Sequence, residues 1–351
     1  MMNNGTPTER RSDQWAQLDE VSLRLLSSQG PAEVIKVPLA LAAVVANAFL
    51  VFTIIKTPAM RTKSQLIVAS LGGAEMISQL AFAYTGLRRS VHYLADWPET
   101  NWQIRCMLLA YPHTLAIHCQ VAMMLLVSLD RLLAVGAPVL YRSWSTNSYI
   151  TGINLLAWSY ALLHIPFVFI GVDSGARKPI CTAYATLSQG YVRSMIIEGN
   201  IIGASTFLLY IATLAILARR LIITPRLAET SRLQSRRQLE LGTAKTLAVF
   251  IAVYLITFGS SCIISMVMTS GVISMQVATK YAPYLALLCN LNALSHLPIY
   301  LIMSKTFRRS FTMVVTPPGD RSADNSAERD RANPGRWPLK HIRWRRLATD
   351  L

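Results

Sequence analysis

Seven long apolar segments constrain this chain more than any other feature of its sequence. Each is longer than the roughly 20 residues that a helix needs to cross a hydrocarbon core of ~30 Å. Bilayer interiors admit only helices or closed barrels, and these segments lack the alternation of barrel strands. The sequence therefore predicts an all-α membrane protein, a bundle of seven transmembrane helices. The segments cover residues 34–55, 66–87, 107–129, 150–172, 191–218, 246–268 and 281–303.

The distribution of basic residues predicts the orientation of the bundle. Most of the 34 Lys and Arg residues lie in the connections at 56–63, 131–147 and 219–245 and in the tail after residue 304. Because cytoplasmic loops are rich in Lys and Arg, we expect the N-terminus outside the cell and the C-terminus inside. The net charge of +16 then reflects topology beside an anionic lipid surface, and no nucleic-acid partner is expected.

The expected outer side carries a glycosylation sequon and two cysteines. The sequon is Asn4-Gly5-Thr6. The residues before the first helix are polar and lack the apolar core of a cleavable signal peptide, so this helix is expected to act as its own insertion signal. Cys106 lies at the outer end of the third helix and Cys181 in the loop after the fourth, both on the oxidising side. We expect either a disulfide that ties this loop over the bundle or two unpaired thiols.

The third helix ends in the pair Asp130-Arg131, within VSLDRLLAVGAPVLY. Together with the seven helices and Cys106, this pair resembles the rhodopsin-like superfamily of G protein-coupled receptors, whose Asp-Arg-Tyr motif is matched except at Leu132. MRTKSQLIVASLGGAE and HLPIYLIMSKTFRRSF are similar to nematode serpentine chemoreceptors of the Srsx type. The resemblance extends along nearly the whole chain, through Asn47, Glu75, Trp158, Pro166, Tyr210 and the segment at 291–311.

The resemblance implies a multi-pass receptor of the plasma membrane that transduces an extracellular ligand, chemosensory or peptide-like, to a heterotrimeric G protein. It implies an extracellular segment at 1–32, a seven-transmembrane domain at 33–304 and a short amphipathic eighth helix at 305–312. Residues 313–351 are rich in Pro, Gly, Asp, Arg and Ser. Such a composition buries little apolar surface, so we expect a disordered basic cytoplasmic tail.

A G protein interface is implied at the inner face of the bundle. Arg131 can reach the cytosol when the bundle opens and otherwise pair with Asp130; the alternative is an interfacial ion pair that only ends a helix. In the family an acid on the sixth helix often holds this arginine. Here Arg236 and Arg237 occupy that neighbourhood, which leaves Glu240 as the nearby candidate. The implied interface residues are Asp130, Arg131, Leu132, Tyr210 and Tyr300.

Glu75 is expected to face the interior of the bundle, because a carboxylate in hydrocarbon costs at least ~2.5 to 3.5 kcal/mol unless it finds partners. Its natural partners are Asn47, Gln120, Asn292 and His296. By resemblance such a cluster holds an allosteric sodium ion. The alternative is a hydrogen-bond network that only fixes helix packing, since Gln120 and His296 depart from the family's usual residues. No other cofactor or metal is expected.

The ligand site is expected in the outer half of the bundle. His113 falls where amine receptors of the family carry an aspartate, so a cationic amine ligand is not expected. Glu198 is an intramembrane acid and thus a candidate site residue; alternatively it pairs with a histidine such as His118 or His164. The seventh helix has no lysine, which argues against a retinal pigment. The candidate ligand contacts are His113, Ser194, Glu198, Tyr254, Thr257, Phe258, Ser261 and Asn290.

Missing prolines leave other functions open. Ile202 on the fifth helix and Ile256 on the sixth replace prolines usual in the family, and Pro298 stands one place late. Because proline kinks give a helix a bend about which it can swing, this chain is expected to move differently or couple weakly. A signalling-silent pseudoreceptor or scaffold is the main alternative. A transporter is less favoured because no internal repeat is seen, and an enzyme because the six histidines are scattered.

The end of the tail, RWPLKHIRWRRLATDL at 336–351, interleaves apolar and cationic residues. Aromatic rings favour the membrane interface, and each Lys or Arg near an anionic leaflet contributes roughly 1 kcal/mol. We therefore expect this stretch to bind the inner membrane surface. The final Thr349-Asp350-Leu351 also fits a C-terminal motif that PDZ domains bind by strand addition, with an unbound solvated tail as the alternative.

Overall fold

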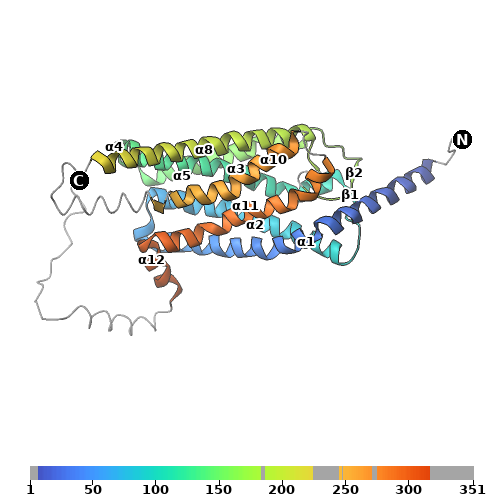
Figure 1. The fold of residues 1–351 in the computed structure, drawn as a ribbon, viewed down its shortest axis with the longest axis horizontal. Coiled ribbons are helices and arrows are strands. Elements are labelled where there is room, and N and C mark those ends of the chain that lie inside the picture. The colour runs from blue at the N-terminus through green and yellow to red at the C-terminus, as the bar shows by residue number, and fades with distance from the viewer. Residues whose placement is uncertain (1–6, 183–185, 224–244, 247, 271–274, 317–351) are drawn as a thin grey trace, which may run out of the picture.

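The protein is a bundle of long helices that lie side by side (Figure 1). The computed structural model describes residues 7–182, 186–223, 245–246, 248–270 and 275–316. Among these residues, six helices are long and apolar enough to cross a membrane, and a shorter apolar helix, Ala248–Thr257, lies in the sixth expected segment. These elements confirm the predicted all-α bundle of seven transmembrane segments.

The helical elements divide into long spans and short connecting pieces. The long helices are α1 (Pro7–Lys56), α2 (Lys63–Leu94), α3 (Gln103–Gly136), α5 (Thr146–Leu163), α8 (Gln189–Ile223) and α11 (Met275–Met303). The shorter elements are η1 (Pro58–Met60), α4 (Pro138–Ser143), α6 (Ile165–Phe169), the turn η3 (Leu255–Gly259), α10 (Ser260–Thr269) and α12 (Lys305–Val315).

Hydroxyl side chains cap several helices at their first turn. Thr62 accepts a hydrogen bond from the backbone N–H of Gln65 at the start of α2, over 3.4 Å. Ser145 caps α5 and Ser304 caps α12 in the same way, each over 3.2 Å. The first N–H groups of a helix have no partner within the helix, so these caps satisfy them and define where the helices begin.

The fourth span is interrupted at His164. α5 ends at Leu163, and the short helix α6 continues the span from Ile165. Pro166 lies in the first turn of α6. Because proline has no N–H to donate to the preceding turn, it separates the two helices. The break leaves His164 at the junction, where its ring stacks on that of His118 from α3.

The sixth span contains a π-helical turn, η3, at Leu255–Gly259. A π-turn inserts an extra residue into a helix and is one of the recognised causes of a helix kink. The turn includes Ile256, which occupies the place of the proline usual in the family. The sixth span therefore departs from regular α-helix where a kink is expected, although it has no proline there.

The outer end of the bundle is closed by a small sheet and a disulfide. β1 (Asn101–Trp102) pairs in antiparallel fashion with β2 (Arg177–Lys178). Cys106 and Cys181 form a disulfide with their Cα atoms 4.9 Å apart, which confirms the predicted link. The N-terminal part of α1 lies at this same end, and α12 lies at the opposite end (Figure 1).

α1 begins earlier than the apolar segment that it contains. The sequence predicts a polar N-terminal segment at 1–32, whereas the described chain is helical from Pro7 onward. Ser22, Leu26 and Gln29 are almost fully buried, so tertiary contacts hold this part of the helix. At the other end of the chain, α12 runs to Val315, three residues beyond the expected end at 312.

The main core of the bundle lies between α2, α3 and α5. Met123 of α3 packs there with Leu71 of α2 and Ala157 of α5. A second cluster holds α12 against the inner end of the bundle, where the fully buried Phe307 packs with Tyr300 of α11. α12 therefore buries one face against the inner end of the bundle, as an amphipathic helix does.

Candidate functional site

Three hydroxyl groups hold the Asp130 carboxylate at the inner end of α3. It accepts hydrogen bonds from Ser64 of α2 (2.5 Å), Tyr141 of α4 (2.8 Å) and Tyr149 of α5 (3.2 Å). Asp130 is 1% exposed, so these bonds replace its hydration. Burial raises the pKa of Tyr141, which keeps this hydroxyl protonated and able to donate. The acid thus joins α3 to three neighbouring elements.

Arg131 faces a different set of groups from its neighbour Asp130. It interacts electrostatically with Tyr300 of α11 and Tyr210 of α8, as well as with Asp130 and Tyr141. In the described part of the chain, no ion pair of contact distance joins Arg131 to Asp130, because hydroxyl groups occupy the carboxylate oxygens. The structure therefore brings four of the predicted inner residues together.

Two other residues of the expected inner site are not seen to join this group of side chains. Leu132 is half-buried on α3. Glu240, the expected partner of Arg131 from the sixth helix, lies outside the described residues. The sequence did not predict the hydrogen-bond partners of Asp130, which are Ser64, Tyr141 and Tyr149. Residues with hydroxyl groups are common, and nothing in the spacing of these three connects them with Asp130.

Glu75 lies fully buried in the middle of the bundle. Its Oε1 accepts a hydrogen bond from Nε2 of Gln120 on α3 over 3.3 Å, and its Oε2 lies 3.0 Å from Nδ1 of His296 on α11. The carboxylate therefore connects α2, α3 and α11. Gln120 and His296 are two of its four expected partners.

The two asparagines of the expected cluster bond to other groups. Asn47 donates to the backbone carbonyl of Ala293 on α11, over 3.1 Å. The Asn292 side-chain oxygen accepts a hydrogen bond from the hydroxyl of Thr257 in η3, also over 3.1 Å. These bonds tie α1 and the sixth span to α11. They extend the polar layer around Glu75 without contacting its carboxylate.

The two side chains that contact the Glu75 carboxylate do not offer a sodium ion the ligands that it prefers. Hard cations prefer oxygen ligands, whereas both carboxylate oxygens here face nitrogen atoms. The Gln120 amide can rotate to offer its oxygen, but the His296 ring cannot, and it lies at ion-pair distance. The arrangement fits the alternative expectation, an internal network in which His296 is the main partner of Glu75.

His113 lies on α3 and contacts α2. Its Nδ1 is 3.4 Å from the hydroxyl of Ser78, and its ring meets that of Phe82 edge-on with centroids 4.3 Å apart. The side chain is half-buried. The imidazole is thus anchored on the α2 side of the outer half, away from the other histidines of the spans.

Glu198 of α8 lies beside two histidines. Its Oε1 is 3.3 Å from Nε2 of His164 and 3.7 Å from Nδ1 of His118. The two imidazole rings stack with centroids 3.8 Å apart and an interplanar angle of 12°. Nε2 of His118 lies 2.9 Å from the hydroxyl of Tyr191, one of the first residues of α8. This cluster combines nitrogen and oxygen donors from three spans.

The remaining candidate ligand contacts lie mainly on the sixth and seventh spans. Tyr254, Thr257, Ser261 and Asn290 are buried there, whereas Ser194 is exposed on α8. The side chain of Phe258 lies outside what the structure describes. Two surface cavities, of about 590 Å³ at 143–156 and about 460 Å³ between α2 and α3, include none of the candidate contacts in their lining.

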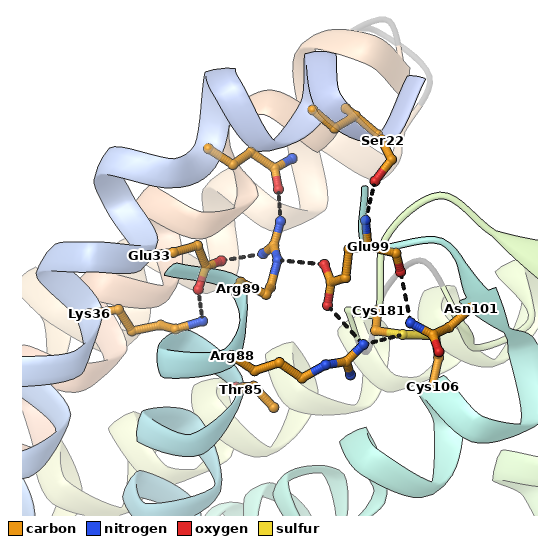
Figure 2. A network of polar contacts seen from close by, with 12 residues as sticks. Ser22, Glu33, Lys36, Thr85, Arg88, Arg89, Glu99, Asn101, Cys106 and Cys181 are labelled. Atoms are coloured by element: carbon orange, nitrogen blue, oxygen red, sulfur yellow. Dashed lines mark hydrogen bonds and ion pairs between the residues drawn. A yellow bond between two sulfur atoms is a disulfide. The ribbon is translucent and has the colours of Figure 1, made fainter. Parts of the chain in front are cut away.

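A buried network of charges lies beside the disulfide at the outer end (Figure 2). Arg89 of α2 pairs with Glu33 of α1, donates to Gln29 over 2.5 Å, and lies 3.3 Å from Glu99 in the first outer loop. Lys36 pairs with the same Glu33. Figure 2 shows the Arg89 side chain between the two acids. The network binds α1, α2 and the loop together.

Glu99 connects this network to the rest of the outer end. Its backbone N–H donates to Ser22 of α1 over 2.8 Å, and its side chain lies 3.5 Å from Arg88, whose guanidinium reaches Cys181 of the disulfide (Figure 2). Burial raises the pKa of Glu99, while Arg89 and Arg88 oppose this rise. The network was not predicted from the sequence. Its charged residues lie in or near the loops, where charges in the sequence indicate only membrane orientation.

The seven spans, the disulfide at the head of α3 and the Asp-Arg pair at its foot define the class of seven-transmembrane receptors. The sequence matches the family described as serpentine type 7TM GPCR chemoreceptor Srsx over residues 40–315. This match covers more than half of the chain, so the chain belongs to the Srsx family of G protein-coupled chemoreceptors. The expected resemblance is confirmed, as is the expectation of a multi-pass membrane protein.

A second comparison places the chain near another receptor of the same kind. Leukotriene B4 receptor 1 of Mus musculus is 26% identical over 177 residues, which are 50% of this chain and 49% of that protein. The chain therefore spans about half the length of this curated relative.

Proposed function

We propose that this chain binds an extracellular ligand and transmits the signal to a heterotrimeric G protein. Membership of a receptor family supports the class of function. The observation that carries the proposal is the arrangement at the inner end of α3. Asp130 is bound to hydroxyl groups of neighbouring elements, and Arg131 faces tyrosines of α8 and α11. Arg131 is thus free of a short acid contact in the described residues and available to a partner that enters between these helices.

The ligand is proposed to bind in the outer half, between α3 and the spans of α8, α10 and α11. His113 supplies a polar group beside α2 and Glu198 supplies one on α8, while the buried Thr257, Ser261 and Asn290 supply others on the sixth and seventh spans. His113 stands where amine receptors carry an aspartate, so the proposal excludes a simple cationic amine. A chemosensory or peptide-like ligand is retained from the sequence.

A nucleotide-exchange assay tests this function. Cells that express the chain are screened with a ligand panel, read out by calcium and cyclic AMP, and active ligands are then tested for GTP exchange on Gα in membranes. Arg131→Ala is expected to abolish ligand-dependent exchange with normal surface expression. Arg24→Ala is the matched control, because its side chain is 77% exposed on α1 and pairs with Glu20 at the surface.

The outcome separates the alternatives. Exchange that is unchanged in Arg131→Ala would contradict the proposed interface. Surface expression without exchange for any ligand would favour the signalling-silent scaffold, and ligand uptake into proteoliposomes would favour a transporter. The sixth span bears on this choice, since η3 provides a helix irregularity where the missing proline had suggested weak coupling.

The tail extends the proposal to two further contacts, both in residues outside the described part of the chain. We propose that 336–351 binds the anionic inner leaflet and that Leu351 offers its carboxylate to a PDZ domain. A peptide of 336–351 is expected to bind anionic vesicles, to lose affinity with added salt, and to bind neutral vesicles poorly. Removal of the last three residues is expected to abolish PDZ capture and leave vesicle binding unchanged.

A further inference from the structure

We propose that His118, His164 and Glu198 form a site for a divalent transition-metal ion, with zinc the best fit. The three side chains come from α3, from the junction of α5 and α6, and from α8. One ligand atom from each lies within 4.8 Å of the others. The sequence offered these residues only as a pair of Glu198 with His118 or His164, and it did not indicate a metal site because they show no short metal-binding spacing.

The distances from Glu198 to the two histidines are close to those between ligands of a tetrahedral metal centre. Zinc bonds nitrogen and oxygen ligands at about 2.0–2.2 Å, which places two ligands of a tetrahedral site roughly 3.4 Å apart. Glu198 Oε1 lies 3.3 Å from Nε2 of His164 and 3.7 Å from Nδ1 of His118. The three ligand atoms lie within 4.8 Å of one another, so rotation of the two stacked rings would bring all three onto one ion, with a fourth position for water or a ligand group.

The orientation of His118 supports the same site. Histidines that bind metals usually donate their other ring nitrogen to a second group, which fixes the ring. Nε2 of His118 lies 2.9 Å from the Tyr191 hydroxyl, and its Nδ1 is the nitrogen that faces Glu198. Stacking against His164 holds the ring plane. The Nδ1 donor that a metal needs is therefore already directed at Glu198.

The donor types indicate which ion binds, and the side chains differ in how far the protein encloses them. Two imidazole nitrogens and one carboxylate oxygen suit zinc, copper or nickel, whereas magnesium and calcium prefer oxygen alone. His118 is 4% exposed, but His164 and Glu198 keep 19% and 25% of their side-chain surface accessible. These two side chains are therefore not fully enclosed by protein.

Zinc binding to the purified receptor tests the site. The full chain is freed of metal with a chelator in detergent and titrated with Zn²⁺ against a fluorescent chelator. One zinc per chain is expected at the site, and His118→Ala, His164→Ala and Glu198→Gln are each expected to weaken it by more than about 100-fold. Tyr191→Phe removes only the group that orients His118, and a loss of about 10- to 100-fold is expected.

His113→Ala is the matched control, because it removes a histidine of the same helix whose contacts are Ser78 and Phe82. It is expected to bind zinc as the unaltered chain does. Co²⁺ in place of Zn²⁺ gives a second readout, since a tetrahedral nitrogen and oxygen site produces strong visible absorption. Zinc binding that is equal in Glu198→Gln and the unaltered chain, or no such Co²⁺ absorption in the unaltered chain, would overturn the proposal whether or not the other variants fold. Neither measurement depends on signalling, so failure here is distinct from failure of the proposed function.

Discussion

The two ends of the bundle handle buried charge in opposite ways. At the outer end, Arg89 sits between Glu33 and Glu99, so each charge has a partner of opposite sign. At the inner end, Asp130 is surrounded by neutral hydroxyl groups and Arg131 has no acid at contact distance in the described residues. A buried ion pair is strongly destabilised when one partner is lost, whereas hydroxyl contacts exchange for others at lower cost.

Because of this difference, we expect the outer end to be rigid and the inner end to change shape more easily. The outer network joins α1, α2 and the first loop next to the disulfide, and it is expected to stay in one arrangement. The inner contacts join α3 to α2, α4 and α5 through single hydroxyl groups. We infer that shape changes of the receptor concentrate at the inner end, where the proposed G protein contact lies. Variants at the two ends should therefore fail in different ways.

Arg89→Ala is expected to have the largest effect. It leaves the carboxylates of Glu33 and Glu99 buried without their central partner, which costs about 3–5 kcal/mol of stability. The thermal midpoint of the receptor in detergent measures the loss. Arg24→Ala removes an exposed pair and is expected to change the midpoint little. Equal effects of the two variants would mean that the outer network contributes no more than a surface pair.

Tyr141→Phe is expected to have a smaller effect on stability and a visible one on signalling. It removes one of three hydrogen bonds to the Asp130 carboxylate, worth roughly 1.5–3 kcal/mol for a bond to a charged group. Because the inner end is then less constrained, basal GTP exchange on Gα should rise. Tyr84→Phe, at an exposed position of α2, is the control. A loss of stability with unchanged basal exchange would show that this end is as rigid as the other.

The smallest expected effect is on the pH dependence of stability, to which the buried carboxyl group of Glu99 contributes. Burial raises its pKa above the ordinary 4.5, so between that value and the folded-state pKa the folded chain binds more protons than the unfolded one. Stability from this group is therefore present at low pH and falls as pH rises through that interval. Glu99→Gln should remove this slope of the thermal midpoint with pH, and Glu20→Gln, on the exposed surface of α1, should keep it. Identical slopes in the unaltered chain and Glu99→Gln would contradict the assignment.

The spans and the disulfide could be predicted from sequence because each follows from a local pattern. Apolar length predicts a crossing helix, and the side of the membrane predicts which cysteines are oxidised. The partners of Glu75 were also within reach, since a carboxylate in the middle of a span needs polar neighbours and the spans offer few. Gln120 and His296 are two of those few, and both lie against it.

The partners of Asp130 and Arg89 could not be predicted in the same way. Asp130 binds Ser64, Tyr141 and Tyr149, which come from three elements whose mutual rotation no local pattern specifies. Arg89 lies at the outer end of a span. Charged residues are common at the ends of membrane spans, so its position did not indicate that it would be buried. Its burial depends on the helical extension of α1 before residue 34, which a polar composition did not indicate. Tertiary packing decided both cases.

The π-turn of the sixth span changes the angular phase between the two parts of that helix. One extra residue rotates everything beyond it by about 100° relative to an uninterrupted α-helix. Residues that precede Leu255 and residues that follow Gly259 therefore cannot be assigned to a common face by counting in steps of three and four. Deletion of a single residue within the turn would restore that phase and turn Ser261 away from Cys289 of α11, whose sulfur now lies 3.4 Å from the serine hydroxyl.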